Sequence, residues 1–241
     1  TTAPGQTDRK LPVALWIFGG GLREGWGSEP EFDGEAWAGK EVVLVTFNYR
    51  VGVFGFLTHP ELSAESPEGV SGNYGILDQI EALKWVKKNI AQFGGDPNNI
   101  TIFGQSAGGR STKTLCASPL ARGLFNKAII MSASGLGSMP AFAPLTLQES
   151  AQQTKEVMDW AGLTNLEKMR AASTEVIFTV GGIYQSVTGN RTWMSSGLIS
   201  PIVDGYVLKE SFDDAAVNNN LANVPYMIGF TLNDSGNMAP G

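Results

Sequence analysis

The sequence predicts an α/β fold with a mostly parallel β-sheet and helices on both faces. Two observations carry this prediction: a series of short apolar runs with the composition of buried strands, and an amphipathic segment that joins two of them. The strand candidates are rich in β-branched and aromatic residues and are bounded by Gly, Pro, Asn or polar residues. They are Val13–Phe18, Val42–Phe47, Ile100–Phe103, Ala128–Met131 and Tyr226–Ile228.

An amphipathic helix is predicted between the second and third of these strands, over Ile76–Phe93. Its apolar residues recur at spacings of three and four, which places them along one face of an α-helix. They are Ile76, Ile80, Leu83, Val86, Ile90 and Phe93. The sequence Gly94-Gly95-Asp96-Pro97 then ends the helix. Strand, helix and strand in this order predict a βαβ crossover within a parallel sheet.

A second helical region is predicted over Thr146–Ala172, with a break at Gly162. Thr146 followed by Glu149 has the spacing of a capping box at the helix start. The residues from there to Ser200 carry a weaker pattern. We expect the whole stretch to form helical excursions over the carboxyl ends of the strands. No internal repeat, low-complexity linker or domain boundary is visible, so a single domain is expected.

The composition excludes several classes of protein. The formal net charge is -6 and no basic run is longer than Lys87-Lys88, so no nucleic-acid partner is expected. No apolar run reaches the roughly 18 residues of a membrane span. The sequence has no metal-ligand cluster, so neither a metal nor an organic cofactor is implied. Cys116 is the single cysteine, so an intrachain disulfide is ruled out. We expect its side chain to be buried as a small hydrophobic group.

The compartment and the oligomeric state stay open. The segment Thr1–Lys10 is polar and lacks the apolar stretch that a signal peptide carries behind a basic start. A secreted protein after processing would have the same appearance, so cytoplasmic and secreted locations are both compatible with the sequence.

A candidate nucleophile lies directly after the third predicted strand. Gly104-Gln105-Ser106-Ala107-Gly108 matches G-x-S-x-G, a motif that requires a strand before it and a helix after it. Ile100–Phe103 precedes the motif, and Ala107–Cys116 can form a helix. A serine on such a turn adopts a strained backbone, while the flanking glycines let neighbouring chain pass close by. An ordinary glycine-rich turn would carry the same residues, but the strand–helix context favours the nucleophile.

A candidate oxyanion hole follows the first predicted strand, at Phe18-Gly19-Gly20-Gly21. Three glycines leave backbone N–H groups unshielded by any β-carbon. Acyl transfer needs such donors aimed at the tetrahedral oxyanion. A flexible loop tip is the structural alternative. A glycine run upstream of G-x-S-x-G on a parallel sheet favours an enzyme of acyl transfer.

These segments resemble the type-B carboxylesterase family, which includes cholinesterases, bacterial carboxylesterases and some fungal lipases. The resemblance is near-continuous from Leu11 to about Ser134, is looser to Pro201 and is most like the bacterial members. The motifs that carry it are Leu11–Gly21, Asn48–Leu57, Gly72–Gln79, Phe93–Pro97, Gly104–Gly109, Pro201–Gly205 and Pro225–Asp234. The resemblance implies an α/β-hydrolase fold and a small-molecule ester substrate that is hydrolysed through a serine acyl-enzyme.

The resemblance also implies roles for individual residues. Ser106 would be the nucleophile, and the oxyanion N–H groups would come from Gly20, Gly21 and Ala107. The family's triad acid falls five residues after a glycine that closes a strand. Gly229 matches that glycine and Asp234 matches the acid. Asn233-Asp234-Ser235-Gly236 is also good turn chemistry by itself, so the local sequence alone leaves a turn role open.

The histidine of the triad has no counterpart at the expected place. His59 is the single histidine, and its segment is an ordinary loop in the family; only seven residues follow Asp234. The triad histidine should come well after the acid. We therefore expect residues 1–241 to be a single catalytic core that is incomplete at both ends. A longer parent protein, or a second chain, would carry the histidine.

Two alternatives remain. A catalytically silent relative that serves as a binding module, or an inactive fragment, would also lack the histidine. The retention of Ser106, the glycine run and Asp234 argues against it.

Arg110, one helical turn after Ser106, stands where the family usually has a small residue. It either reaches solvent or adds positive potential near the pocket. Acyl and alcohol preference, and the choice between esterase and lipase, are not fixed by the sequence.

Overall fold

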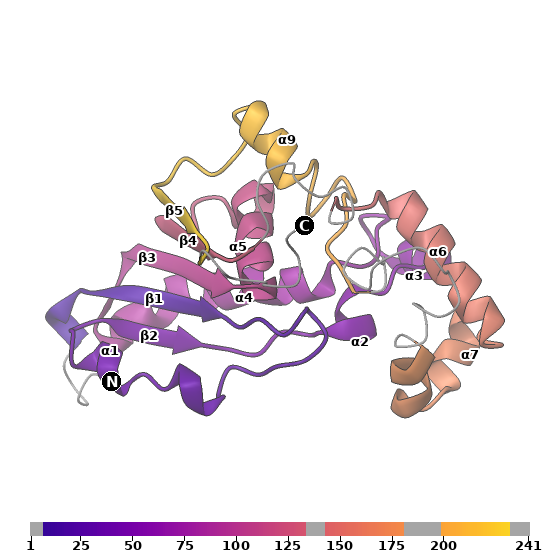
Figure 1. The fold of residues 1–241 in the computed structure, drawn as a ribbon, viewed down its shortest axis with the longest axis horizontal. Coiled ribbons are helices and arrows are strands. Elements are labelled where there is room, and N and C mark those ends of the chain that lie inside the picture. Colours follow the sequence, from indigo (N-terminus) through magenta and orange to yellow (C-terminus); the bar gives the residue numbers. More distant parts are fainter. Residues whose placement is uncertain (1–6, 134–142, 181–198, 232–241) are drawn as a thin grey trace.

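The computed structural model describes residues 7–133, 143–180 and 199–231. Its centre is a five-stranded sheet in the order β2-β1-β3-β4-β5, in which every pairing is parallel (Figure 1). The strands are β1 Leu11–Ile17, β2 Val43–Thr46, β3 Gly95–Gln105, β4 Lys127–Met131 and β5 Tyr226–Gly229. The five predicted strands and the parallel sheet are therefore confirmed.

The strand order contains a topological switch point between β1 and β3. The chain leaves β1 toward β2 on one side of the sheet, and it leaves β3 toward β4 and β5 on the other side. In open parallel sheets, ligands bind at the carboxyl ends of two neighbouring strands whose connections diverge in this way. The segments that follow β1 and β3 are the predicted oxyanion loop and the predicted nucleophile.

Helices α4 (Tyr74–Asn89) and α5 (Ala107–Ala117) pack on one face of the sheet. Leu15 of β1 is fully buried there, in one cluster with Leu83 of α4 and Leu115 of α5. Side chains of neighbouring strand residues point to opposite faces. Accordingly Trp16 lies on the other face and packs against Phe32 at a ring-centroid distance of 5.1 Å, with the two rings tilted by 53°. Phe32 ends η2 (Pro30–Phe32), which together with α1 (Glu35–Ala38) covers that second face.

The predicted helix over Ile76–Phe93 is confirmed with one correction. Regular α-helix ends at Asn89 and continues as η3 (Ile90–Phe93), a 3₁₀ turn. A 3₁₀ turn has three residues per turn, so it rotates the following side chains away from the face that a 3.6-residue period predicts. Phe93 was expected on the buried face, but it is 50% exposed and packs against exposed Trp85.

Strand β5 corrects a second expectation. Tyr226–Ile228 was predicted as a buried strand, and it does pair with β4. It is, however, the last strand of the described sheet, and Met227 and Ile228 are 66% and 60% exposed. The apolar composition of the run correctly predicted a strand, but it did not predict that the side chains of this strand are exposed.

A second helical layer lies beyond the carboxyl ends of β1 and β2 (Figure 1). It consists of α2 (Gly52–Phe56), α3 (Pro60–Glu65), α6 (Leu147–Trp160) and α7 (Leu166–Ala171). The predicted capping box is formed, since Thr146 and Glu149 each cap the other's backbone N–H. The predicted break is also present, at Gly162 with a φ of +78°. Helices α6 and α7 are the excursion predicted over Thr146–Ala172, whereas α2 and α3 were not predicted; residues 181–198 of the predicted stretch lie outside the described residues.

Three further short elements lie around the sheet and its helices: η1 Thr7–Arg9, η4 Pro119–Ala121 and α9 Phe212–Val217, of which α9 packs against α5. Cys116 of α5 is fully buried, and the surrounding apolar side chains raise the pKa of its thiol to about 12. None of the helices in the described ranges combines the length and the apolar character needed to cross a bilayer.

Candidate active site

Ser106 stands on a strained turn between β3 and α5. Its backbone has φ +55° and ψ -120°, a conformation that costs a residue with a β-carbon about 1–3 kcal/mol. The turn is held on both sides: the Ser106 N–H donates to the Met131 carbonyl at 3.0 Å, and the Arg110 N–H donates to the Ser106 carbonyl at 2.9 Å. Ser106 therefore lies at the carboxyl end of the sheet, half-buried, with a helix beginning directly behind it.

The glycines of the motif are required by close backbone contacts. A β-carbon on Gly108 would lie 2.0 Å from the Ile17 carbonyl oxygen, and one on Gly104 would lie 2.5 Å from the Gly108 carbonyl carbon. Both distances are far below any real contact, so only glycine fits at either position. These contacts press the start of α5 against the end of β1. The expectation that neighbouring chain passes close to the motif glycines is met.

The glycine run lies directly beside Ser106. A β-carbon on Gly19 would lie 2.9 Å from the Gln105 carbonyl oxygen and 3.6 Å from the Ser106 β-carbon. Gly20 and Gly21 have φ values of +86° and +67°, which glycine adopts without strain. The Gly20 carbonyl accepts the N–H groups of Arg23 and Glu24, which closes the loop into a tight turn. The structure thus brings the end of β1 and the start of α5 together at one point.

Ala107 is the first residue of α5. The first N–H groups of an α-helix have no carbonyl of a preceding turn to bond. They also lie at the positive end of the helix macrodipole, which favours negative charge. The Ala107 N–H therefore belongs to a helix terminus that begins at Ser106, next to the Gly19–Gly21 loop.

Asp234 lies outside the described residues, so its role stays a prediction. The strand that leads toward it is described. β5 ends at Gly229, whose carbonyl accepts the Ser132 N–H at 2.8 Å, and it lies beside β4 in the sheet. Because all five strands are parallel, β5 ends at the same edge as β3. The chain after Gly229 thus leaves the sheet on the side where Ser106 lies.

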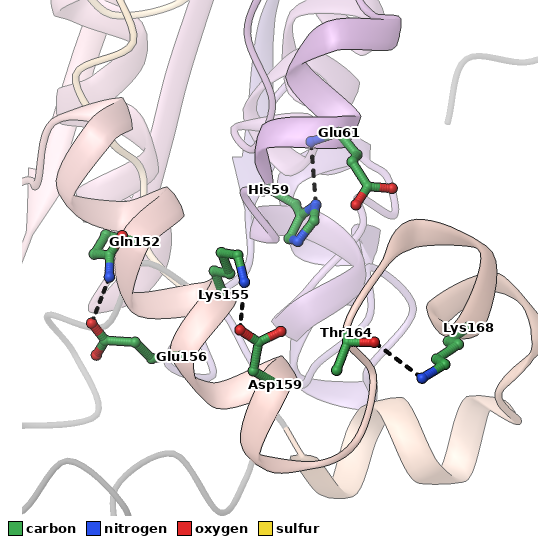
Figure 2. A network of polar contacts seen from close by, with 8 residues as sticks. All are labelled: His59, Glu61, Gln152, Lys155, Glu156, Asp159, Thr164 and Lys168. Atoms are coloured by element: carbon green, nitrogen blue, oxygen red, sulfur yellow. Dashed lines mark hydrogen bonds and ion pairs between the residues drawn. The ribbon is translucent and has the colours of Figure 1, made fainter.

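His59 occupies a structural position away from this turn. It precedes α3, and its Nδ1 accepts the Glu61 N–H at 3.3 Å (Figure 2). Its backbone exchanges hydrogen bonds with the Ser71 hydroxyl. His59 as a whole is 2% exposed, and its ring lies close to Lys155 and Asp159 of α6. Burial is the main cause that lowers the pKa of His59 below its ordinary value. None of the hydrogen bonds that His59 makes within the described residues reaches Ser106. His59 is therefore a loop residue whose ring bonds its own turn, which agrees with the expectation that its segment is an ordinary loop.

Arg110 is half-buried rather than extended into solvent. Its guanidinium donates to the Ser200 hydroxyl at 3.3 Å. Burial lowers its pKa to about 10, so it remains a cation at neutral pH. A fixed positive charge therefore stands one helical turn from Ser106.

Among the residues that the structure describes, no group of three or more His, Cys, Asp or Glu side chains could hold a metal ion.

Sequence reasoning did not single out Tyr49. Its phenol donates to the Phe18 carbonyl at 2.7 Å, directly before the glycine run, although the two residues are 31 positions apart. Tyr49 lies in the Asn48–Leu57 segment, one of the motifs that carry the family resemblance. A buried tyrosine needs a partner for its hydroxyl, but the sequence does not say which carbonyl provides it.

A parallel sheet with a strained serine on the strand–helix turn, and a glycine loop beside that serine, defines an α/β-hydrolase. Comparison with known proteins agrees with this class. The model of the carboxylesterase family matches residues 2–241, and the chain belongs to that family.

Individual relatives give the same result. The chain is 43% identical over 219 residues to fumonisin B1 esterase of Sphingopyxis macrogoltabida, a match that covers 91% of the chain and 38% of the relative. It is 37% identical over 235 residues to para-nitrobenzyl esterase of Bacillus subtilis, covering 96% of the chain and 45% of the relative. A solved PNB esterase structure superposes with a TM-score of 0.82 at 33% identity, covering 97% of this chain and 48% of that one.

The predicted resemblance to the bacterial side of this family is confirmed. The chain spans less than half the length of these curated relatives, 38% and 45% of them. The structural match likewise covers 48% of the solved chain.

Proposed function

We propose that this chain supplies the nucleophile and the oxyanion hole of a serine carboxylesterase. The observation that carries the proposal is the position of Gly19 against Ser106, where a β-carbon on the glycine would lie 3.6 Å from the serine β-carbon. An ester carbonyl that approaches Ser106 Oγ meets the backbone N–H groups of this loop and of the α5 terminus. Acyl transfer needs this combination of a nucleophile and donors for the developing oxyanion.

The reaction would proceed in two half-reactions. Ser106 Oγ attacks the ester carbonyl while a histidine takes the hydroxyl proton, and the carbonyl π electrons move to the oxygen. The N–H groups of Gly20, Gly21 and Ala107 stabilise that oxyanion. Collapse of the tetrahedral intermediate expels the alkoxide, which receives the proton from the histidine. Water, deprotonated by the same histidine, then attacks the acyl-enzyme, and the carboxylic acid leaves as Ser106 regains its proton.

In this proposal the base is a histidine that these 241 residues do not include. His59 is the single histidine of the chain, and its Nδ1 is engaged by the Glu61 N–H. Asp234 would orient the incoming histidine, consistent with the chain order Ser, acid, His of α/β-hydrolases. The printed names of the relatives describe esterases, which supports a carboxylic ester as the substrate class.

The test is pre-steady-state kinetics on the native protein, purified from the cells that make it. A para-nitrophenyl ester should give a burst of nitrophenol with one equivalent per active site, because the acyl-enzyme forms faster than it is hydrolysed. Ser106→Ala should abolish both the burst and the turnover. A native protein that hydrolyses the ester equally well after Ser106→Ala contradicts the proposal. A protein that shows no turnover at all supports the alternative, a silent binding module.

A further inference from the structure

The backbone on either side of the glycine run is held by one segment that follows β2. At the start of the run, the Tyr49 hydroxyl donates to the Phe18 carbonyl at 2.7 Å. At its end, the Gly52 N–H donates to the Leu22 carbonyl at 2.6 Å. Both carbonyls flank the glycines that are proposed to bind the oxyanion. The Tyr49–Gly52 segment therefore holds both ends of the glycine run by hydrogen bonds.

This segment is itself anchored to α4. The Asp78 carboxylate accepts the Arg50 backbone N–H at 2.9 Å, and it accepts two guanidinium N–H groups of the same residue at 2.8 and 2.7 Å. The Arg50 carbonyl also packs tightly, since a β-carbon on Gly55 would lie 2.2 Å from it and one on Gly75 would lie 2.4 Å from it. The backbone next to Tyr49 is therefore held firmly in place.

Buried polar groups also lie near Tyr49. The Gln79 side-chain amide donates to the Ser111 hydroxyl oxygen at 3.0 Å, and Ser111 is near enough to the Tyr49 phenol to affect its pKa. Gln79 and Ser111 are 0% exposed, and Tyr49 is 6% exposed. Since Ser111 belongs to the helix that begins behind Ser106, Tyr49 also lies beside the nucleophile's own helix.

The ring of Tyr49 has a second contact with the same residue. It stacks on the Phe18 ring at a centroid distance of 4.2 Å and an interplanar angle of 20°. The hydroxyl and the ring together fix the Phe18 carbonyl and its side chain. A peptide unit is planar, so fixing a C=O also fixes the N–H of the following residue, here Gly19. The direction of the next N–H groups then depends on that first plane.

We infer that Tyr49 is a positioning residue for the oxyanion hole: through its hydrogen bond to the Phe18 carbonyl it sets the direction of the N–H groups in the Gly19–Gly21 loop. This inference rests on the proposed function. Glycine has the widest backbone freedom of any residue, so a run of three glycines has no orientation of its own. Tyr49 supplies the constraint that the glycines lack. Burial raises the pKa of its phenol far above the ordinary value, which keeps the hydroxyl protonated and able to donate.

The test compares Tyr49→Phe with Tyr226→Phe in the native protein. Tyr49→Phe keeps the stacked ring and removes only the donor. Loss of a direct oxyanion donor lowers kcat by about 100-fold or more, so loss of its positioning residue should lower kcat by about 10-fold with KM nearly unchanged. Affinity for a trifluoromethyl ketone, which forms a tetrahedral adduct on the serine, should fall by the same factor. Tyr226 makes a comparable bond, to the Ala222 carbonyl at 2.6 Å, away from the loop. Its variant should leave kcat and the adduct affinity within about 2-fold of wild type.

Active-site titration separates a positioning role from a loss of folded protein. If kcat per titrated site is the same in Tyr49→Phe and wild type, the inference is overturned. If Tyr49→Phe does not yield folded protein, Asp78→Asn leaves the phenol in place and weakens the anchor of the neighbouring Arg50 on α4. It should lower kcat per site about 3-fold, and unchanged kcat per site again overturns the inference. Ser106→Ala in the same assay distinguishes the two levels: if it stays active the proposed function fails, whereas an inactive Ser106→Ala beside an unaffected Tyr49→Phe rejects the inference alone.

Discussion

The α-carbon of Gly108 packs against the main-chain carbonyl of Ile17 so closely that a β-carbon on residue 108 would lie 2.0 Å from that oxygen. This contact joins the start of α5 to the end of β1. The helix behind Ser106 and the loop that carries Gly20 and Gly21 therefore sit at a fixed separation. That separation is the geometric basis of the proposed catalytic site.

Gly108→Ala should disrupt this contact and destabilise the protein. The added methyl group overlaps the Ile17 carbonyl and can be accommodated only if α5 moves away from β1. We expect the free energy of unfolding to fall by about 1–3 kcal/mol, as in other overpacked cores, together with loss of the proposed esterase activity. Chemical denaturation of the native protein and its variant measures the change.

Gly39→Ala is the matched control. Gly39 has a φ of -62°, and a β-carbon there would lie 3.7 Å from the nearest atom, an ordinary contact distance. Stability should change by less than about 0.5 kcal/mol. Equal denaturation midpoints for the two variants would show that the model of the β1–α5 contact is wrong.

Replacing Ser106 should reveal the backbone strain at the turn. Glycine tolerates φ +55° and ψ -120°, whereas alanine keeps the β-carbon that makes this conformation costly. Both Ser106→Gly and Ser106→Ala should be inactive, but Ser106→Gly should be the more stable by about 1 kcal/mol. The order is the reverse of that for an exposed helix position, where alanine is the more stable. Thermal unfolding of the two variants decides, and a more stable Ser106→Ala speaks against strain at Ser106.

Asn73 should be a major structural residue. It is fully buried and joins two segments 129 residues apart: its amide donates to the Ile202 carbonyl and the Asp204 carboxylate, both at 2.9 Å, and its oxygen accepts the Ile202 N–H at 3.0 Å. Asn73→Gly removes these bonds but suits the left-handed φ of +52°. We expect a loss of about 3 kcal/mol in the free energy of unfolding, and about 1 kcal/mol more for Asn73→Ala.

Asn219 provides the control for this prediction. It is exposed and has a similar φ of +57°. Asn219→Gly should therefore change the free energy of unfolding by no more than about 0.5 kcal/mol. If Asn73→Gly is equally mild, the buried bonds to Ile202 and Asp204 do not hold the two segments together.

The pH dependence of stability should contain a contribution from His59. Burial is the largest cause that lowers its pKa from the ordinary 6.5, with a smaller lowering from Lys155 and opposing effects of Glu61 and Asp159. Below pH 6.5 the unfolded chain binds a proton that the folded protein does not yet bind. Stability should therefore fall as the pH drops below about 6.5, with a slope of at most about 1.4 kcal/mol per pH unit from this group.

His59→Asn isolates that contribution, because asparagine keeps a side-chain acceptor at the start of α3 and does not titrate. Denaturation curves of both proteins between pH 8 and pH 5 should show the variant gaining stability relative to wild type only below about pH 6.5. A difference between the two proteins that is constant over this range contradicts a lowered pKa of His59.

Much of the fold followed from local patterns. Some elements depend only on residues within one turn or one strand, so their patterns can be recognised in a single sequence. These are the strands, α4, α5 and the capping box of α6. The close approaches at Gly104 and Gly108 were predicted in kind, because G-x-S-x-G between a strand and a helix has few other backbone solutions. The identities of the glycine partners, such as the Ile17 carbonyl, were not predictable.

The parts that escaped prediction depend on contacts between distant segments. The Tyr49 hydroxyl bonds a carbonyl 31 residues away, and Asn73 bonds Ile202 across 129 residues. The residues next to Tyr49 and Asn73 in the sequence do not indicate which distant groups these side chains bond. The exposure of Phe93 follows from a switch to 3₁₀ geometry at Ile90, which the apolar spacing does not encode. Coverage of β5 is likewise set by whatever packs on it, not by its own residues.

Labelling of the native protein with a fluorophosphonate, followed by peptide mapping, tests the central claim most directly. An activated serine attacks the phosphorus and retains the phosphonyl group, whereas unactivated serines do not react. The account predicts one adduct per active site, on the peptide that contains Ser106, and no adduct in Ser106→Ala. A native protein that hydrolyses esters while Ser106 stays unmodified, or that carries the adduct on another residue, would contradict it.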